Sequence, residues 1–311
     1  MEIRKDSSML KINRICIPLG LSCNFNCKYC FRNIARRELP SELSEDMKEY
    51  LRSLSPEWCE SVIMSGGEPL LYFDKIKEVL SYVPANVHKC IMSNCSLLTQ
   101  EIVDYMNDNN IELHLSHDGA ETEYLRGVDV LKDPVIANLV KQVKILMVFA
   151  VVTNRNTDIR ANYEDTAAKL GRRDFIYKTN AVYETPTNKD LILGFDYDEF
   201  ARTFEYYVHT ILEYSPHYCN CTIKDSKSRS NGFNVDLHGN VIGMATLTKL
   251  GTIHNSKEEL IAAQDASEPD TGYCNNSGCL YKDRCTSQRQ LASPHFCKCS
   301  HIMGECYGQF D

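Results

Sequence analysis

The chain has 311 residues, of which 43% are hydrophobic and 24% are charged, and its formal net charge is −8. This composition is that of an ordinary globular protein, large enough to bury a core without a disulfide scaffold. The excess of acidic residues argues against broad electrostatic binding of nucleic acid. The longest apolar run, residues 145–152, is far shorter than the roughly 20 residues that span a bilayer. No secretory apolar segment is found near the N-terminus, so we expect a cytoplasmic protein without nucleic-acid or membrane partners.

Strand-like and helix-like segments alternate through the first 180 residues. The apolar runs that predict strands are 12–18, 62–65, 88–92, 111–116, 144–153 and 175–178. Apolar residues at helical spacing predict helices over 43–54, 73–82 and 159–170 and from Thr99 onward. About six β-α units of this kind predict an α/β fold with a parallel sheet covered by helices. Periodicity does not separate an open sheet from a barrel, but in both the polar loops after the strands meet at one end.

The pattern changes after about residue 185. Residues 196–214 predict one long amphipathic helix, and 232–245 predict a hairpin that turns at residues 238–240. Beyond Asp265 the chain is rich in loops and cysteine, so a bound metal centre is the expected source of order there. We therefore predict three units, listed by residue number as 1–190, 191–231 and 232–311.

Cysteine is the anomaly of the composition, with fifteen in one chain and eight of them between Cys219 and Cys306. In a reducing compartment such thiols stay free unless they bind metal or do chemistry. Three isolated cysteines in apolar surroundings are expected to be small buried hydrophobic residues, namely Cys16, Cys59 and Cys90. The clustered cysteines need another explanation.

The first cluster is the C-x3-C-x2-C segment of Cys23, Cys27 and Cys30, which directly follows a predicted strand. Three thiolates in one short loop can hold an iron–sulfur cluster and leave one iron open to another ligand. Zinc is the alternative, although a structural zinc site takes four protein ligands and no fourth cysteine or histidine lies nearby.

This segment, with Tyr29 before its last cysteine, resembles the radical S-adenosylmethionine superfamily. The resemblance is strengthened by Ser65–Pro69, SGGEP, which ends the next strand where the family has its Gly-Gly-Glu-Pro motif. It implies a partial (β/α)6 barrel in which the open iron of a 4Fe–4S cluster binds S-adenosylmethionine. Gly66, Gly67 and Glu68 would hold the methionine amino group, since glycines permit close backbone approach and a carboxylate complements an ammonium group.

Polar residues after the later strands match the family's remaining cofactor contacts. The resemblance places Ser93 and Asn94 near the ribose and Ser116 and Asp118 near the carboxylate of the ligand. It places Thr153 and Asn154 near the adenine. Arg126 would pair with the same carboxylate. The alternative for each is an ordinary polar residue that caps a loop.

The C-terminal cysteines resemble the SPASM extension carried by many peptide-modifying members of the superfamily. Two departures concern its inner auxiliary cluster, because Met244 and Arg289 stand where that pattern has cysteine. The resemblance therefore implies one auxiliary iron–sulfur cluster, with ligands Cys274, Cys279, Cys285 and Cys297 and with Cys299 or Cys306 as alternative fourth ligands. Cys219 and Cys221 could join a rearranged second cluster, and a structural zinc knot is the alternative for the whole tail.

The resemblance implies an enzyme that cleaves S-adenosylmethionine with an electron from a flavodoxin or ferredoxin. The resulting 5′-deoxyadenosyl radical would abstract a substrate hydrogen. A SPASM-like tail favours modification of a ribosomally made peptide by cross-linking, thioether formation or epimerisation. The alternatives are a radical reaction on a sugar, amino acid or nucleotide, and an electron carrier without enzymatic activity. Only 22 residues precede Cys23, so we expect a separate leader-binding protein or the barrel mouth to recognise a peptide.

Overall fold

The structure, a computed structural model, describes residues 14–30, 39–57, 59–204, 232–243 and 248–267, together with His295, Lys298, Cys299 and Ile302. Within these residues nine strands form one sheet in the order β6-β5-β4-β3-β2-β1-β7-β8-β9. Neighbouring strands from β6 to β7 are parallel, and the last two pairings are antiparallel.

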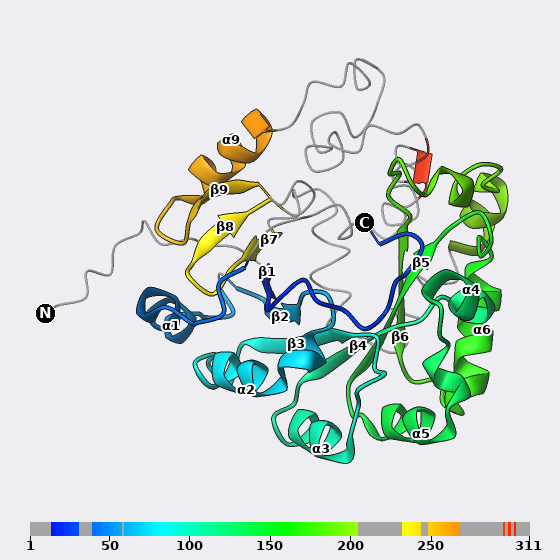
Figure 1. Ribbon diagram of the computed structural model, residues 1–311, viewed down its shortest axis with the longest axis horizontal. Coiled ribbons are helices and arrows are strands. Elements are labelled where there is room, and N and C mark those ends of the chain that lie inside the picture. The colour runs from blue at the N-terminus through cyan, green and yellow to red at the C-terminus, as the bar shows by residue number, and fades with distance from the viewer. Residues whose placement is uncertain are drawn as a thin grey trace, which may run out of the picture.

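Strands and helices alternate along the chain as the sequence predicts. The first six strands are β1 Arg14–Pro18, β2 Ser61–Ser65, β3 His88–Ser93, β4 Glu112–Ser116, β5 Leu146–Val152 and β6 Ile176–Ala181. The helices between them are α1 Glu45–Arg52, α2 Phe73–Ser81, α3 Gln100–Asp108, α4 Thr122–Arg126, α5 Pro134–Gln142 and α6 Ile159–Leu170. Figure 1 shows the helices on the convex side of a curved sheet, which confirms the predicted partial barrel.

Side-chain caps fix the starts of the predicted helices. The hydroxyl of Ser44 accepts a hydrogen bond from Met47 N, and that of Thr99 accepts one from Ile102 N. Helices α4 and α5 were not predicted. For α5 a signal was present, because the Asp133 carboxylate caps the helix and Pro134 occupies its first turn.

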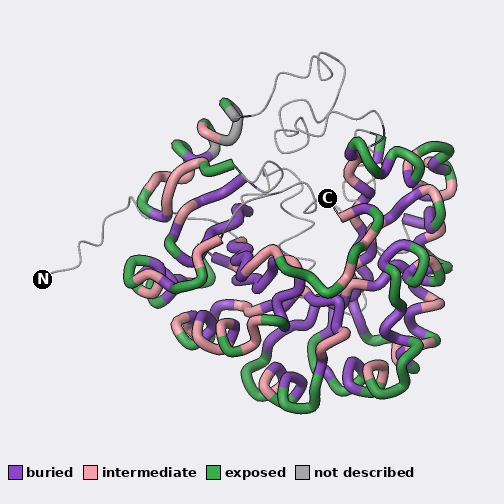
Figure 2. The backbone as a smooth tube through the Cα atoms, viewed as in Figure 1, coloured by how far each residue is buried: buried purple, intermediate pink, exposed green. Residues whose placement is uncertain are grey.

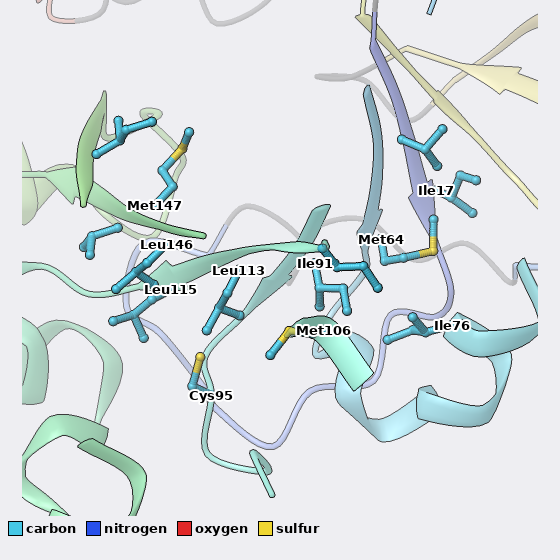
Figure 3. Close-up of a cluster of buried hydrophobic side chains, with 14 of the residues drawn as sticks. Ile17, Met64, Ile76, Ile91, Cys95, Met106, Leu113, Leu115, Leu146 and Met147 are labelled. Carbon is cyan, nitrogen blue, oxygen red and sulfur yellow. The ribbon is translucent and has the colours of Figure 1, made fainter. Parts of the chain in front are cut away.

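The main hydrophobic core lies between the sheet and its outer helices. Side chains of the strands, among them Ile17, Met64, Ile91 and Leu113, face Ile76 of α2 and Met106 of α3 (Figure 3). Figure 2 shows the strands buried while the helices expose their outer faces. Each helix thus packs against the sheet through the apolar face that the spacing of its apolar residues predicts.

The opposite face of the sheet lines the concave side of the barrel. Cys16, Ile63 and Cys90 form a separate small cluster on it, because alternate residues of a strand point to opposite faces. The predicted burial of Cys16, Cys59 and Cys90 is confirmed.

The predicted hairpin is present and extends the barrel sheet. Strand β7 spans Gly232–Val235 and pairs with β8, Asn240–Ile242, across a turn in which Gly239 has φ +79°. Strand β7 also lies parallel to β1, with Arg14 opposite Gly232, a pairing that the sequence did not predict. Strand β9, Lys249–Thr252, and helix α9, Lys257–Ser267, follow. The division into three units at 190 and 231 stays a prediction.

The predicted long helix is described only in its first part. Residues 197–204 are helical, and Phe200 and Phe204 are fully buried as expected. The remainder, 205–214, lies outside the described residues. In the described part of the chain, no helix combines the length and the apolar character needed to cross a membrane.

Candidate functional site

The cysteine triplet lies on the loop that follows β1. Figure 1 shows this dark-blue segment running from β1 towards α4. Lys28 N donates a hydrogen bond to Leu125 O of α4 at 2.9 Å, which fixes the far end of the loop. Cys23 is exposed, Cys27 and Cys30 are half-buried, and all three thiols are free.

The glycines after β2 hold the near end of the loop. Gly67 N donates to Gly20 O at 2.8 Å, and Glu68 N donates to Ser22 O at 2.9 Å. A Cβ on Gly67 would lie only 2.1 Å from Ser22 O, and Gly66 has φ +144°, which favours glycine. The close backbone approach that we predicted for a ligand is therefore made, in the structure, by the segment that leads into Cys23.

Glu68 ties the turn after β2 to the end of β3. Its side chain is buried, and its Oε1 accepts hydrogen bonds from Ser93 Oγ at 2.7 Å and Leu70 N at 3.0 Å. Its Oε2 accepts one from Asn94 N at 2.8 Å. Burial raises the pKa of Glu68, while these donors act in the opposite direction.

Asn94 brings the end of β3 to the cysteine loop. Its Nδ2 donates to Asn24 Oδ1 at 2.9 Å and lies 4.0 Å from Cys23 Sγ. The two predicted residues thus make different contacts: the Ser93 hydroxyl bonds to Glu68, whereas the Asn94 amide faces the cysteine loop.

Asp118, at the end of β4, joins Tyr29 to Arg126. The fully buried carboxylate accepts a hydrogen bond from Tyr29 Oη at 2.5 Å. It also accepts bonds from Arg126 Nε at 2.7 Å and Arg126 Nη2 at 2.9 Å, a bidentate ion pair. The guanidinium lies 5.4 Å from the centre of the Tyr29 ring. Predicted as a partner of a ligand carboxylate, Arg126 therefore already holds a carboxylate of its own chain through these two nitrogens.

The loop after β5 is held by Asn156. Its Oδ1 accepts from Thr153 N at 2.7 Å and from Thr153 Oγ1 at 2.9 Å, and its Nδ2 donates to Asp118 O at 3.2 Å. Thr153 is fully buried, so its hydroxyl shapes the loop in this structure. Ser116 is half-buried at the end of β4.

Sequence reasoning missed two structural residues of this site, Asp118 as an anchor and Asn156 as a clamp. A signal was available for the first, because Arg126 follows Asp118 by eight residues, across a short helical segment. No comparable local pattern marks Asn156.

The thiols influence one another, as a shared ligand site requires. Burial raises the pKa of Cys27 to about 11, the Arg126 guanidinium lowers it, and the nearby Cys30 and Cys23 raise it. Burial also raises the pKa of Cys23, against a hydrogen bond from Phe25 N. Burial thus favours the protonated form of the Cys23 and Cys27 thiols, and metal binding displaces these protons.

The donor set fits an iron–sulfur cluster better than one metal ion. Within the described part of the chain, the triplet is not among the side-chain groups whose ligand atoms all lie within 4.8 Å of one another. A single zinc ion, with Zn–S bonds of about 2.3 Å, would need such close sulfur atoms. A cluster carries its iron atoms at separate corners and accepts more widely spaced cysteines.

Most of the predicted C-terminal ligands lie outside the described residues. These are Cys219, Cys221, Cys274, Cys279, Cys285, Cys297 and Cys306, so the auxiliary cluster stays a prediction. Met244 and Arg289, which stand where the SPASM pattern has cysteine, also lie outside the described residues. Cys299 is buried, with its Sγ 3.9 Å from Nε2 of His295. The other ring nitrogen of His295 lies 2.8 Å from Tyr197 Oη.

Comparison with known proteins supports this reading of the loop and the barrel. Residues 17–144 match the family described as the Radical SAM superfamily. An uncharacterized protein of Methanocaldococcus jannaschii is 29% identical over 105 residues, which are 32% of this chain and 36% of that protein. The AdoMet-dependent heme synthase of Methanosarcina barkeri is 25% identical over 240 residues, 71% of this chain and 67% of its own.

A solved structure shows the same fold. Native anSMEcpe with bound AdoMet and Cp18Cys peptide superposes with a TM-score of 0.65 over 96% of both chains, at 19% identity. The chain spans about a third of the length of the M. jannaschii relative.

Proposed function

Because residues 17–144 match the Radical SAM superfamily, we propose that Cys23, Cys27 and Cys30 hold a 4Fe–4S cluster whose open iron binds S-adenosylmethionine. When bound, these groups supply a 5′-deoxyadenosyl radical that abstracts a hydrogen atom from the substrate. The observation that carries the proposal is the three-thiol loop seated on the Gly66–Gly67 turn, at the carboxyl end of the strands.

The chain's own residues fix where the cofactors would sit. The Gly66–Gly67 turn and the α4 backbone hold the two ends of the cysteine loop. Asp118 orients Arg126 through Nε and Nη2, and we assign the third guanidinium nitrogen, Nη1, to the ligand carboxylate. Asn94 and Ser116 are the polar side chains that we assign to direct cofactor contact, whereas Ser93 and Thr153 act through Glu68 and Asn156.

We propose a peptide as the substrate, with an auxiliary cluster on the C-terminal cysteines. Support comes from the anSMEcpe structure, which contains a peptide and shares the fold over nearly the whole chain. A small molecule is the second candidate, because the heme synthase of M. barkeri aligns over 71% of the chain. An electron from a small redox protein would start either reaction.

The test is anaerobic reconstitution with iron and sulfide, followed by addition of S-adenosylmethionine and a reductant. We expect formation of 5′-deoxyadenosine, and we expect Cys27→Ala to abolish it because the cluster loses one of three ligands. Cys59→Ala is the control, since it likewise removes one thiol but at a buried position outside the loop. Normal 5′-deoxyadenosine formation by the Cys27 variant would overturn the assignment, and failure of the reconstituted protein to bind S-adenosylmethionine would favour an electron carrier.

The two substrate classes are separated by deuterium transfer. A peptide substrate deuterated at the reacting carbon should deliver deuterium into 5′-deoxyadenosine, whereas a small-molecule enzyme leaves the peptide unchanged and the 5′-deoxyadenosine free of deuterium.

A further inference from the structure

A second group of metal-ligating side chains lies on the concave face of the barrel. His88 and Cys90 alternate along β3, and Glu112 and His114 alternate along β4. Cys90 is paired with Glu112 and Met92 with His114, so all four side chains point to the same face of the sheet. This group is separate from the cysteine loop, because Asn94 follows Cys90 by four positions, or about 13 Å of strand.

Three of these side chains are close enough to share one ion. One ligand atom from each of His88, Cys90 and Glu112 lies within 4.8 Å of the other two. Nε2 of His88 is 2.5 Å from Oε2 of Glu112, and Nε2 of His114 is 3.2 Å from Oε1 of Glu112. Glu112 is almost completely buried, whereas the His88 side chain is 36% exposed and offers a way in.

Buried polar atoms in this group lack hydrogen bonds. Oε1 of Glu112 and both ring nitrogens of His114 are buried without a hydrogen-bond partner, although Nε2 of His114 lies 3.2 Å from Oε1 of Glu112 in an ion-pair contact. Native proteins rarely leave such atoms unsatisfied, and a bound ion is one way to satisfy them. A buried imidazole, that of His114, thus lies beside the three ligand atoms on the same face of the sheet.

We propose that His88, Cys90 and Glu112 bind one divalent transition-metal ion, with His114 beside Glu112. An imidazole nitrogen, a thiolate and a carboxylate select zinc or cobalt rather than magnesium or calcium, which prefer oxygen ligands. Binding replaces the contact between His88 and Glu112 and displaces the thiol proton of Cys90. The thiolate and the carboxylate then neutralise the double positive charge.

The surroundings act on the thiol in opposite directions. Burial raises the pKa of Cys90 and the Glu112 charge raises it further, whereas Arg14 and Lys178 lower it. Three protein ligands leave a coordination position for water or a substrate group, as in catalytic zinc sites. The inference goes beyond the proposed radical chemistry and does not depend on it.

The test uses the full chain after anaerobic reconstitution, so that the iron–sulfur ligands are already occupied. Loosely held iron is removed with a chelator, cobalt(II) is added, and the bound cobalt is counted and measured by X-ray absorption. We expect about one cobalt per chain, with one sulfur at about 2.3 Å and nitrogen or oxygen ligands at about 2.0 Å. Cys90→Ala should remove the sulfur ligand and most of the cobalt, and His88→Gln should lower cobalt content at least tenfold.

Controls keep the result interpretable. Cys59→Ala removes a buried cysteine outside the group and should keep the full cobalt content. His88→Gln changes a partly exposed side chain, so circular dichroism should show a folded protein even if Cys90→Ala does not fold. Cobalt bound by three or four sulfur ligands would overturn the proposal, as would an unchanged cobalt content in the His88 variant. His88, Cys90 and Glu112 would then be a group of polar side chains that contact one another without a metal. Because 5′-deoxyadenosine formation is not the readout, failure of this site and failure of the radical function are distinguishable.

Discussion

At the scale of single residues, the cysteine loop depends on the absence of two side chains. Gly66 and Gly67 let residues 19–22 lie directly on the turn after β2, where their carbonyl groups accept hydrogen bonds from it. The position of Cys23 is therefore set by backbone contact and not by the packing of side chains. This explains why the two glycines accompany the cysteine triplet even before a ligand is considered.

We predict that Gly67→Ala displaces the cysteine loop. The added methyl would lie 2.1 Å from Ser22 O, which must move, and overpacking of this kind costs roughly 1–3 kcal/mol of unfolding free energy. Iron content after reconstitution should fall by about one cluster, and 5′-deoxyadenosine formation should be lost. Gly194→Ala is the control, because its Cβ meets nothing within 4 Å although its φ is +75°. Equal iron in the two variants would show that the contact does not position the loop.

At the scale of elements, a buried network behind Asp118 joins the end of β4 to α6. His117 places Nδ1 2.9 Å from Thr166 Oγ1 of α6 and Nε2 3.2 Å from Asp129 Oδ1. Lys169 of α6 donates to Asp129 Oδ2 at 2.8 Å. Since His117 precedes Asp118 in the chain, these contacts hold the strand end from which Asp118 reaches Tyr29 and Arg126.

We predict that Asp129→Asn lowers the unfolding free energy by roughly 2–3 kcal/mol at pH 7, because a buried charged partner is lost. Burial raises the pKa of Asp129, but His117 and Lys169 outweigh it and hold that pKa well below its usual range. The ionised carboxylate therefore stabilises the fold fully above its unfolded pKa of about 3.9, and this stabilisation is lost as the pH falls towards the folded pKa.

Urea unfolding of both proteins at pH 7 and pH 3 measures this difference. The difference in unfolding free energy between wild type and Asp129→Asn should be smaller at pH 3 than at pH 7. Asp165→Asn, which removes a more exposed partner of Lys169, should cost at most about 1 kcal/mol. If this difference in unfolding free energy is the same at both pH values, the carboxylate of Asp129 does not stabilise the fold through its charge.

Single residues and secondary-structure elements both show how much the sequence could predict. Helices with a side-chain cap and an apolar stripe, such as α1, were predicted to within two residues at each end, because their signals are local. The cysteine triplet and the turn after β2 were recognisable for the same reason. Asp118 was missed as an anchor because its partner Tyr29 lies 89 positions away, and the register of β7 against β1 depends on contacts of still longer range.

At the scale of the whole molecule, we propose two cluster sites, one on the cysteine loop of the barrel and one on the C-terminal cysteines. We predict about eight iron atoms per reconstituted chain, four for each cluster. Cys279→Ala should lose about four irons yet still cleave S-adenosylmethionine without coupling to substrate, since the barrel residues that hold the first cluster are untouched. Iron analysis with parallel 5′-deoxyadenosine measurement checks both parts. Unchanged iron in this variant would mean that the tail binds no cluster.

The place of β1 in the sheet has a consequence for synthesis on the ribosome. One edge of β1 pairs with β2 soon after it emerges, but the other pairs with β7, which is made about 220 residues later. At roughly 5–20 residues per second, the nascent chain carries an unpaired apolar strand edge for about 10–45 seconds. Such an edge is a template for association with other chains. We therefore expect chaperone capture of arrested chains that end before β7, and release of those that include it.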